Sequence, residues 1–439
     1  MSKIKFILPI LFFLFAGMVF GQQIKFEEYD LSNGLHVILQ PDKSNPVVAV
    51  SVSYHVGSKN EKPNRTGFAH FFEHLLFEGS DNIKRGEFDQ YIAKAGGTSN
   101  ANTKQDRTFY HETLPSNQIG LALWLESERM MHAKVEKEGI ETQREVVKEE
   151  KRLRVDNQPY ADALWKELWN YLFPTHPYHW AVIGSMDDLN AASEQDYKDF
   201  YKTFYVPNNA VLTIVGDFDV PQTKKMIDDY FASIPKGADI IRPNVTENPI
   251  TQEITVNIKD KNAQVPALIY GYRASKQIDR DAYVFSLIGN ILSRGESSRF
   301  SKVIVNQKQL ALQAFSMYYP LEDYGVFLVL GLPNQGITID QLNTALDEEI
   351  NNLKNNGITQ TELETQIHKL EKDYVDDLST AMGINETLSD DYLFYHNTNL
   401  INTEMDIFKS ITVDDVKRVA NEYLNQNQRV KLIVTPETN

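Results

Sequence analysis

The sequence predicts an α+β fold with two tandem homologous domains, each a mostly antiparallel sheet covered by helices. The chain has 439 residues, of which 42% are hydrophobic, so it is long enough for more than one core. Strand-like runs and long helical stretches alternate in an order unlike strict βαβ units, which favours a layer of helices on a sheet. An internal duplication accounts for the two domains.

The duplication is visible near the end of each half. Leu189–Val215 aligns without gaps with Phe408–Val434, at an offset of 219 residues. In each copy a polar residue, Ser193 or Thr412, begins an amphipathic helix in the manner of an N-cap. A turn and a β-rich run follow, Val211–Val215 in one copy and Val430–Val434 in the other. An offset this long exceeds any solenoid repeat, so two similar domains are predicted.

Other elements place the boundaries between these domains. The runs Val47–Tyr54 and Pro266–Tyr272 each read as a strand that precedes a helix. The stretch 234–250 contains three prolines and a glycine and is predicted to be an exposed linker. The domains are therefore predicted at 22–233 and 251–439.

The composition restricts the classes of function. Lys+Arg 44 against Asp+Glu 60 gives a net charge of −16, which argues against a nucleic-acid-binding surface because such surfaces need clustered basic charge. There is no cysteine. Disulfides, thiolate nucleophiles and thiolate metal sites are thus excluded, and any metal must be held by His, Asp or Glu.

The first residues predict an exported protein. Lys3 and Lys5 precede the apolar run Phe6–Phe20, and small residues lie near its end, which is the layout of a signal peptide over 1–21 with cleavage after Gly21. The alternative is a membrane anchor, but the run is shorter than the roughly 20 residues that span a bilayer. No membrane span is expected in the mature chain. Its location would be periplasmic in a Gram-negative source and secreted otherwise.

A helix predicted over Thr66–Gly79 carries the first candidate site. Thr66 is suited to cap its start and Gly79 to end it. One face is apolar at helical spacing and is expected to be buried; its residues are Phe68, Phe71, Phe72, Leu75 and Leu76. On the other side, His70 and His74 lie one turn apart with Glu73 beside them. This is the pattern H-x-x-E-H, in which two imidazoles share a metal ion and a carboxylate reaches its water.

Two interpretations of this pattern remain open at this point. One is a metal site, and the other is a pair of hydrogen-bonded core histidines beside a surface glutamate. A second predicted helix, about Glu138–Arg154, carries the adjacent carboxylates Glu149 and Glu150. Neighbouring helix positions point about 100° apart, so at most one of them can face the histidine pair. Two His and one Glu would provide the three protein ligands of a catalytic zinc without cysteine.

The motifs HFFEH at 70–74 and REVVKEEKR at 144–152 resemble those of the pitrilysin/insulinase family of zinc proteases. The similarity covers essentially the whole mature chain and is strongest to the short two-domain type, such as the mitochondrial processing peptidase subunits. It implies one Zn²⁺ per chain held by His70, His74 and Glu150, the last lying 76 residues after the second His. It also implies that Glu73 activates water and that Glu149 points outward. Many relatives carry a further Glu where this chain has Gln143.

The resemblance also indicates how substrate is held. Gly96–Thr103 leads into a predicted strand, Thr108–Leu114, and Ser99, Asn100 and Ala101 match the positions at which relatives bind substrate as an added strand. A sheet edge accepts extended chains with little regard to sequence, so unstructured peptides are the expected substrates. From the residues alone, the segment reads as an ordinary polar turn.

The second half lacks these groups. Ser286, Gly289 and Asn290 match the positions of the metal-site motif. Family members also need an Arg and a Tyr seven residues apart to bind the substrate carbonyl, and Val305 and Leu312 match those positions. Neither side chain can donate a hydrogen bond. The resemblance therefore implies a partner, a related zinc-less subunit in a heterodimer, with a homodimer as the alternative.

The sequence thus predicts a zinc-dependent endopeptidase, with a non-catalytic assembly or binding subunit on the same fold as the alternative. His176 and His179 are rival metal ligands, but they lack an acidic partner at suitable spacing and are interpreted as loop packing. A serine hydrolase is disfavoured because no G-x-S-x-G is present.

Overall fold

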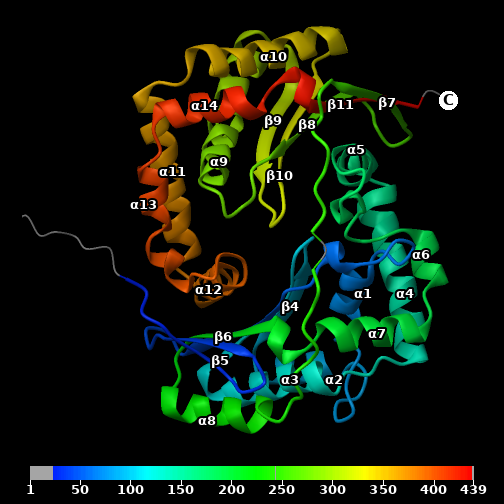
Figure 1. The fold of residues 1–439 in the computed structure, drawn as a ribbon, viewed down its shortest axis with the longest axis vertical. Helices are drawn as coiled ribbons and strands as arrows, with labels where there is room; N and C mark the ends of the chain where they lie inside the picture. Colours follow the sequence, from blue (N-terminus) through cyan, green and yellow to red (C-terminus); the bar gives the residue numbers. More distant parts are fainter. Residues whose placement is uncertain (1–22, 243, 438–439) are drawn as a thin grey trace, which may run out of the picture.

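The computed structural model describes residues 23–242 and 244–437. The predicted signal peptide, 1–21, lies outside the described residues. The described chain forms two sheets, each with helices packed on it, and the second sheet lies above the first in Figure 1. The α+β fold with two domains of similar design is therefore confirmed.

The first sheet has six strands in the order β1-β2-β6-β3-β5-β4. Only the β2–β6 pair is parallel, and β4 forms one edge. The strands are β1 (Glu27–Asp30), β2 (His36–Pro41), β3 (Val47–Tyr54), β4 (Thr98–Thr103), β5 (Thr108–Pro115) and β6 (Ala210–Gly216).

The second sheet repeats this arrangement with five strands in the order β7-β11-β8-β10-β9. Again a single pair, β7–β11, is parallel, and β9 takes the edge position that β4 has in the first sheet. The strands are β7 (Ile254–Asp260), β8 (Ala267–Ala274), β9 (Ala311–Tyr319), β10 (Gly325–Pro333) and β11 (Arg429–Pro436).

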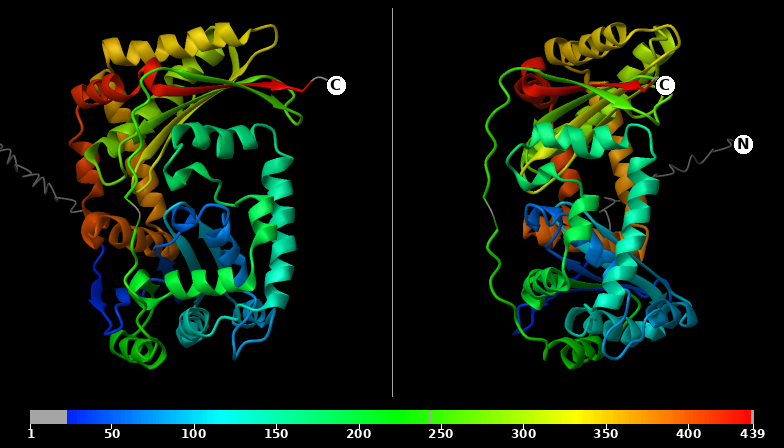
Figure 2. Two further views of the ribbon diagram at one scale, coloured as in Figure 1. Left: turned by 45° about the vertical axis from the view of Figure 1, so that its right-hand side comes forward. Right: turned by 90° about the vertical axis from the view of Figure 1, so that its right-hand side faces the viewer.

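Helices pack on both sheets (Figures 1 and 2). Those of the first half are α1 (Phe68–Leu75), α2 (Glu87–Lys94), α3 (Ile119–Met131), α4 (Lys137–Lys151), α5 (Leu168–Leu172), α6 (Met186–Ala191), α7 (Glu194–Phe204) and α8 (Val220–Phe231). Those of the second half are α9 (Arg280–Ser293), α10 (Ile339–Asn356), α11 (Gln360–Asp377), α12 (Ala381–Tyr395), α13 (Glu404–Lys409) and α14 (Val413–Tyr423). In the described part of the chain, none of these helices is long and apolar enough to cross a bilayer.

The duplicated helices α7 and α14 occupy the same register. Their first residues are 219 positions apart, as are their last. Ser193 and Thr412 cap them as predicted, and each forms a capping box with an aspartate three residues later, Asp196 or Asp415. The side-chain oxygen accepts a backbone N–H that the helix leaves unpaired, which is why the same polar start recurs in both copies.

The two halves exchange covering helices. Helix α12 of the second half packs against β3 and β6 of the first sheet, and α5 of the first half packs against β8 and β11 of the second (Figures 1 and 2). Leu388 of α12 lies in one apolar cluster with Ile38 and Val211, while Leu168 of α5 lies in another with Ile269. Each sheet is therefore completed by the other half of the chain. Between α8 and β7 the described residues form no helix or strand.

Candidate metal centre

Helix α1 begins and ends inside the predicted limits. Gly67, rather than Thr66, is its N-cap and has a left-handed φ of 87°. A Cβ at this position would lie 2.8 Å from the carbonyl oxygen of Ile183, so glycine is required. Thr66 instead donates its hydroxyl to Asp188, and the prediction that it caps α1 is wrong. The helix ends at Leu75, before Gly79.

The carboxylate of Glu61 takes over the capping role. It accepts hydrogen bonds from the backbone N–H groups of Gly67 at 2.8 Å and Ala69 at 2.9 Å. These N–H groups would otherwise be unpaired at the start of the helix, where negative charge is favourable. Sequence reasoning missed Glu61 because the acceptor comes from outside the helix.

The apolar face of α1 is buried as predicted, and this fixes the direction of the opposite face. The five predicted side chains are at most 2% exposed; they are Phe68, Phe71, Phe72, Leu75 and Leu76. His70 and His74 consequently face away from the core, toward α4, which contacts α1.

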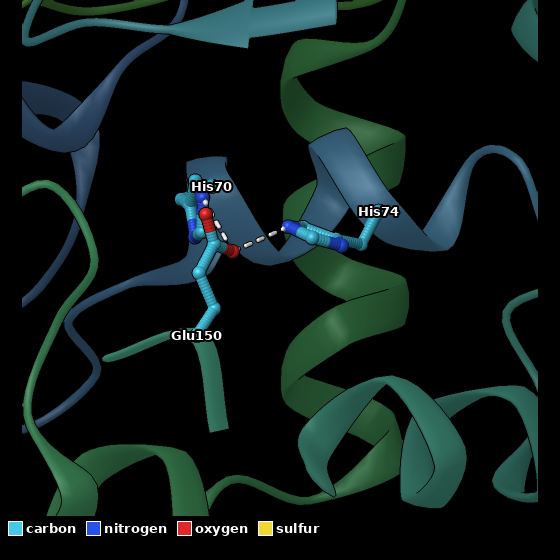
Figure 3. Close-up of side chains that lie close together, drawn as sticks. All are labelled: His70, His74 and Glu150. Atoms are coloured by element: carbon cyan, nitrogen blue, oxygen red, sulfur yellow. Dashed lines mark ion pairs between the residues drawn. The ribbon is translucent and has the colours of Figure 1, made fainter. Parts of the chain in front are cut away.

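Glu150, near the end of α4, lies against both imidazoles (Figure 3). Its Oε2 atom is 3.1 Å from His74 Nε2 and 3.5 Å from His70 Nε2. One potential ligand atom from each residue lies within 4.8 Å of the others, the single such group of three among the described residues. Glu149 points away and pairs with exposed Arg152. Of the two adjacent carboxylates, only Glu150 faces the histidines.

The donor set fits a zinc ion. Ligand atoms 2.0–2.1 Å from a tetrahedral ion lie about 3.3 Å apart, close to the distances that Glu150 makes. Glu150 Oε2, the oxygen that faces the Nε2 atoms of both histidines, is buried and has no hydrogen-bond partner among the described residues. Burial, followed by the nearby His74, lowers the pKa of His70 to about 4, and contact with His74 lowers the pKa of Glu150. Neutral imidazole and ionised carboxylate are the forms that bind metal.

Glu73 lies beside this group without belonging to it. Its Oε2 accepts a hydrogen bond of 2.6 Å from the hydroxyl of Thr103, the last residue of β4. Burial raises the pKa of Glu73 above its usual value. A carboxylate of raised pKa is a stronger proton acceptor near neutral pH, which suits general-base chemistry.

The edge strand β4 carries Ser99, Asn100 and Ala101 next to α1. It pairs with β5 on one side and forms the end of the sheet on the other. Its outer N–H and C=O groups are therefore available to an extended chain. Sequence reasoning placed these three residues but missed Thr103, which links the strand to Glu73.

Of the two rival histidines, His176 has a structural role, and the ring of His179 packs edge-on against Trp180. His176 is 1% exposed, accepts the backbone N–H of Tyr178, and has its Nε2 3.2 Å from Asp323 Oδ2 in the second half. It packs in a loop, as interpreted from the sequence, but its acidic partner was not predicted.

Gln143, where many relatives carry a glutamate, donates a hydrogen bond from its side-chain amide to Glu78 just beyond α1.

The second half holds different groups at the matching positions. Ser286, Gly289 and Asn290 lie on α9 and line a cavity beside β9. Val305 lies in a π-helical turn, and Leu312 is 55% exposed on β9.

Comparison with known proteins is consistent with this geometry. Residues 36–181 match the family model described as insulinase (peptidase family M16), and 191–370 match the model described as peptidase M16 inactive domain. The zinc protease PqqE of Helicobacter pylori is 31% identical over 416 residues, covering 94% of this chain and 93% of that one. An uncharacterized zinc protease of Mycobacterium leprae is 25% identical over 90% of this chain and 88% of its own.

Solved structures of proteases are also similar to this chain. The crystal structure of a Helicobacter pylori protease has a TM-score of 0.89 at 31% identity and covers 94% of this chain and all of that one. The periplasmic protease PqqL of Escherichia coli has a TM-score of 0.77 at 18% identity, which shows a shared fold; this chain matches 48% of its length. The chain belongs to the insulinase, or M16, family of peptidases.

Proposed function

We propose that the protein is a zinc-dependent endopeptidase that hydrolyses unstructured peptides. His70, His74 and Glu150 would hold one Zn²⁺ per chain. The observation that carries this proposal is the convergence of one ligand atom from each residue: Glu150 Oε2, which is buried and has no hydrogen-bond partner among the described residues, faces the Nε2 atoms of both histidines. Polar groups buried in this way are costly unless something binds them.

When bound, zinc supplies Lewis-acid activation of water and of the scissile carbonyl. Glu73 accepts the proton of the attacking water at its carboxylate and later delivers it to the leaving nitrogen. The hydroxyl of Thr103 holds that carboxylate in place through its 2.6 Å hydrogen bond. Arg154, whose guanidinium lies 2.9 Å from Glu150 Oε1, orients the carboxylate of the third ligand.

The peptide would lie along β4 as an added strand, paired with the backbone at Ser99, Asn100 and Ala101. The geometry supports this because β4 is a sheet edge and ends at the residue that bonds Glu73. A bound strand would thus be directed past the catalytic carboxylate. Folded proteins cannot offer such a strand, so flexible peptides are the substrates.

A partner subunit would complete the site. Val305 and Leu312 occupy the positions of the family's Arg and Tyr, and neither donates a hydrogen bond. A related zinc-less chain would supply these donors, with a second copy of this chain as the alternative. The predicted signal peptide, 1–21, further assigns the protein to export, periplasmic in a Gram-negative cell and secreted otherwise.

The replacement Glu73→Gln tests the function. We expect it to keep zinc, measured by metal analysis of the purified protein, and to lose about 10²–10⁴-fold in peptide hydrolysis because the proton acceptor is removed. Glu149→Gln, an exposed carboxylate on the neighbouring helix, serves as the matched control. Both are assayed alone and with a zinc-less family member. Full activity of Glu73→Gln, or zinc-free protein that hydrolyses peptides, would contradict the proposal.

A further inference from the structure

A cavity of about 440 Å³ lies where the two halves meet. Its walls are formed by helix α12, the end of α11, the start of α13, the turn between β4 and β5, and the turn between β9 and β10. Lys104 belongs to the first of these turns and directly follows Thr103, whose hydroxyl bonds Glu73. In Figure 1, β4 lies between α1 and α12. The cavity therefore lies at the end of the edge strand, next to the residue that bonds the proposed catalytic carboxylate.

The walls of this cavity are strongly acidic. Six carboxylates line it, against the single cation Lys104; they are Asp106, Asp377, Glu386, Asp390, Asp391 and Glu404. Three of them have counter-ions outside the cavity lining. Lys59 lies 2.7 Å from Asp106, and Arg107 pairs with both Glu386 and Asp390.

The other three, Asp377, Asp391 and Glu404, make no ion pair among the described residues. Asp391 is 6% exposed, and its Oδ2 atom has no hydrogen-bond partner in the described structure. Burial, then the charges of Glu404 and Asp390, raises the pKa of Asp391 to about 8. Burying an ionised carboxylate with an unpaired oxygen costs free energy, and a neighbouring cation reduces that cost.

The geometry distinguishes between kinds of cation. These carboxylates do not converge on one point, since His70, His74 and Glu150 are the only three-residue metal group among the described residues. A small metal ion is thus poorly matched. The lining also includes the apolar side chains of Pro320, Leu321 and Phe394. A long side chain with an apolar stem and a charged end fits both features, and lysine and arginine bury their stems in this way.

We propose that this cavity is a subsite for a lysine or arginine side chain of the peptide bound along β4. Asp391 and Glu404 would receive the charged end, and Leu321 and Phe394 would contact the stem. Lys104 lines the cavity and directly follows Thr103, which bonds Glu73, so the basic residue would lie within a few residues of the scissile bond. This inference rests on the proposed peptidase function and adds a sequence preference to it.

Binding to the hydrolysis-deficient Glu73→Gln protein tests the subsite separately from hydrolysis. Fluorescence anisotropy would compare labelled peptides that carry lysine, arginine or uncharged norleucine at each position within four residues of the cleaved bond. If no peptide is cleaved, the basic residue is scanned along the whole peptide instead. We expect lysine or arginine at one position to bind at least tenfold more tightly than norleucine. Equal binding of all three peptides would overturn the subsite.

Variants of the cavity complete the test. Asp391→Asn combined with Glu404→Gln should reduce the preference for lysine over norleucine to about one, and Glu404→Gln alone should reduce it in part. Asp229→Asn, an exposed carboxylate on α8, controls for the general attraction of an acidic protein and should keep the preference. A preference that survives in the double variant, with an unchanged thermal midpoint, would overturn the proposal. Failure of the wild-type protein to cleave any peptide, both alone and together with a zinc-less family member, would instead contradict the peptidase function.

Discussion

The hydrogen bond from Thr103 to Glu73 joins the edge strand β4 to the proposed catalytic carboxylate. Replacing Thr103 with Val keeps the side-chain shape and removes the donor. A hydrogen bond to a charged group is worth about 1.5–3 kcal/mol, so we expect kcat to fall roughly tenfold to a hundredfold. Zinc content should stay unchanged, because the side chain of Thr103 bonds Glu73 and makes no hydrogen bond to the three proposed ligands in the described structure. Steady-state kinetics and metal analysis measure the two effects.

Thr98, at the exposed start of the same strand, provides the control for this substitution. Thr98→Val should leave kcat within about twofold of the wild type, since surface substitutions away from special contacts change little. An equal loss in both variants would mean that the strand tolerates no valine. In that case the loss would not report on Glu73.

The residues of the site differ in how far the sequence could predict them. His70, Glu73 and His74 share one helical turn, so their spacing alone placed them on one face. Glu150 needed the family resemblance, because spacing along the chain does not tell which of two adjacent carboxylates turns toward a distant helix. Glu61 and Thr103 carry no local pattern at all. Their partners are brought to them by the tertiary fold.

At the scale of elements, the exchange of helices between the halves has a measurable consequence. Leu388 of α12 is fully buried against Ile38, Val211 and Val215 of the first half. Leu388→Ala should lower the free energy of unfolding by about 2–5 kcal/mol, because it leaves a cavity in an apolar cluster. Denaturant unfolding followed by circular dichroism measures the change.

The control is Val375→Ala on α11, where the side chain is 63% exposed. This variant should change stability by less than about 0.5 kcal/mol. If Leu388→Ala were equally mild, α12 would contribute little to the stability of the first sheet. The exchanged helix would then be a peripheral attachment.

Elements with a clear local period were predictable from the sequence. Val47–Tyr54 alternates as a strand does and forms β3 with those bounds, and the repeated helices α7 and α14 begin at their predicted caps. The positions of α5 and α12 were not predictable, because an apolar stripe indicates that a helix is buried but not against which sheet. The domain limits at 22–233 and 251–439 stay a prediction. The exchange means that neither segment alone contains the full cover of its sheet.

At the scale of the whole molecule, a buried group of charges joins the two halves. Lys59 is 3% exposed, and its Nζ lies 2.7 Å from Asp106 in the first half and 2.5 Å and 3.1 Å from Glu322 and Asp323 in the second. His55 Nε2 lies 3.0 Å from the same oxygen of Glu322. Separating the halves would leave these charges without their partners, which is costly when they are buried. The network therefore favours a fixed arrangement of the two sheets.

Glu322 makes this network sensitive to acid. Burial alone would raise its pKa, but the hydrogen bonds and charges of His55 and Lys59 outweigh burial and hold the pKa of Glu322 well below its ordinary 4.5. The unfolded chain therefore binds a proton at this group before the folded protein does. The stabilising contribution is complete above about pH 4.5 and is lost as the pH falls toward the lowered pKa.

Glu322→Gln removes this titration while keeping the shape of the side chain. Between pH 7 and pH 3 the group should account for about 2 kcal/mol of the loss in unfolding free energy. The variant should thus be less stable than the wild type at pH 7, and the difference should shrink toward pH 3. Urea unfolding at several pH values measures both curves, with exposed Glu364→Gln on α11 as the control. Curves that stay parallel down to pH 3 would show that the contacts of Glu322 with Lys59 and His55 do not stabilise the junction between the halves.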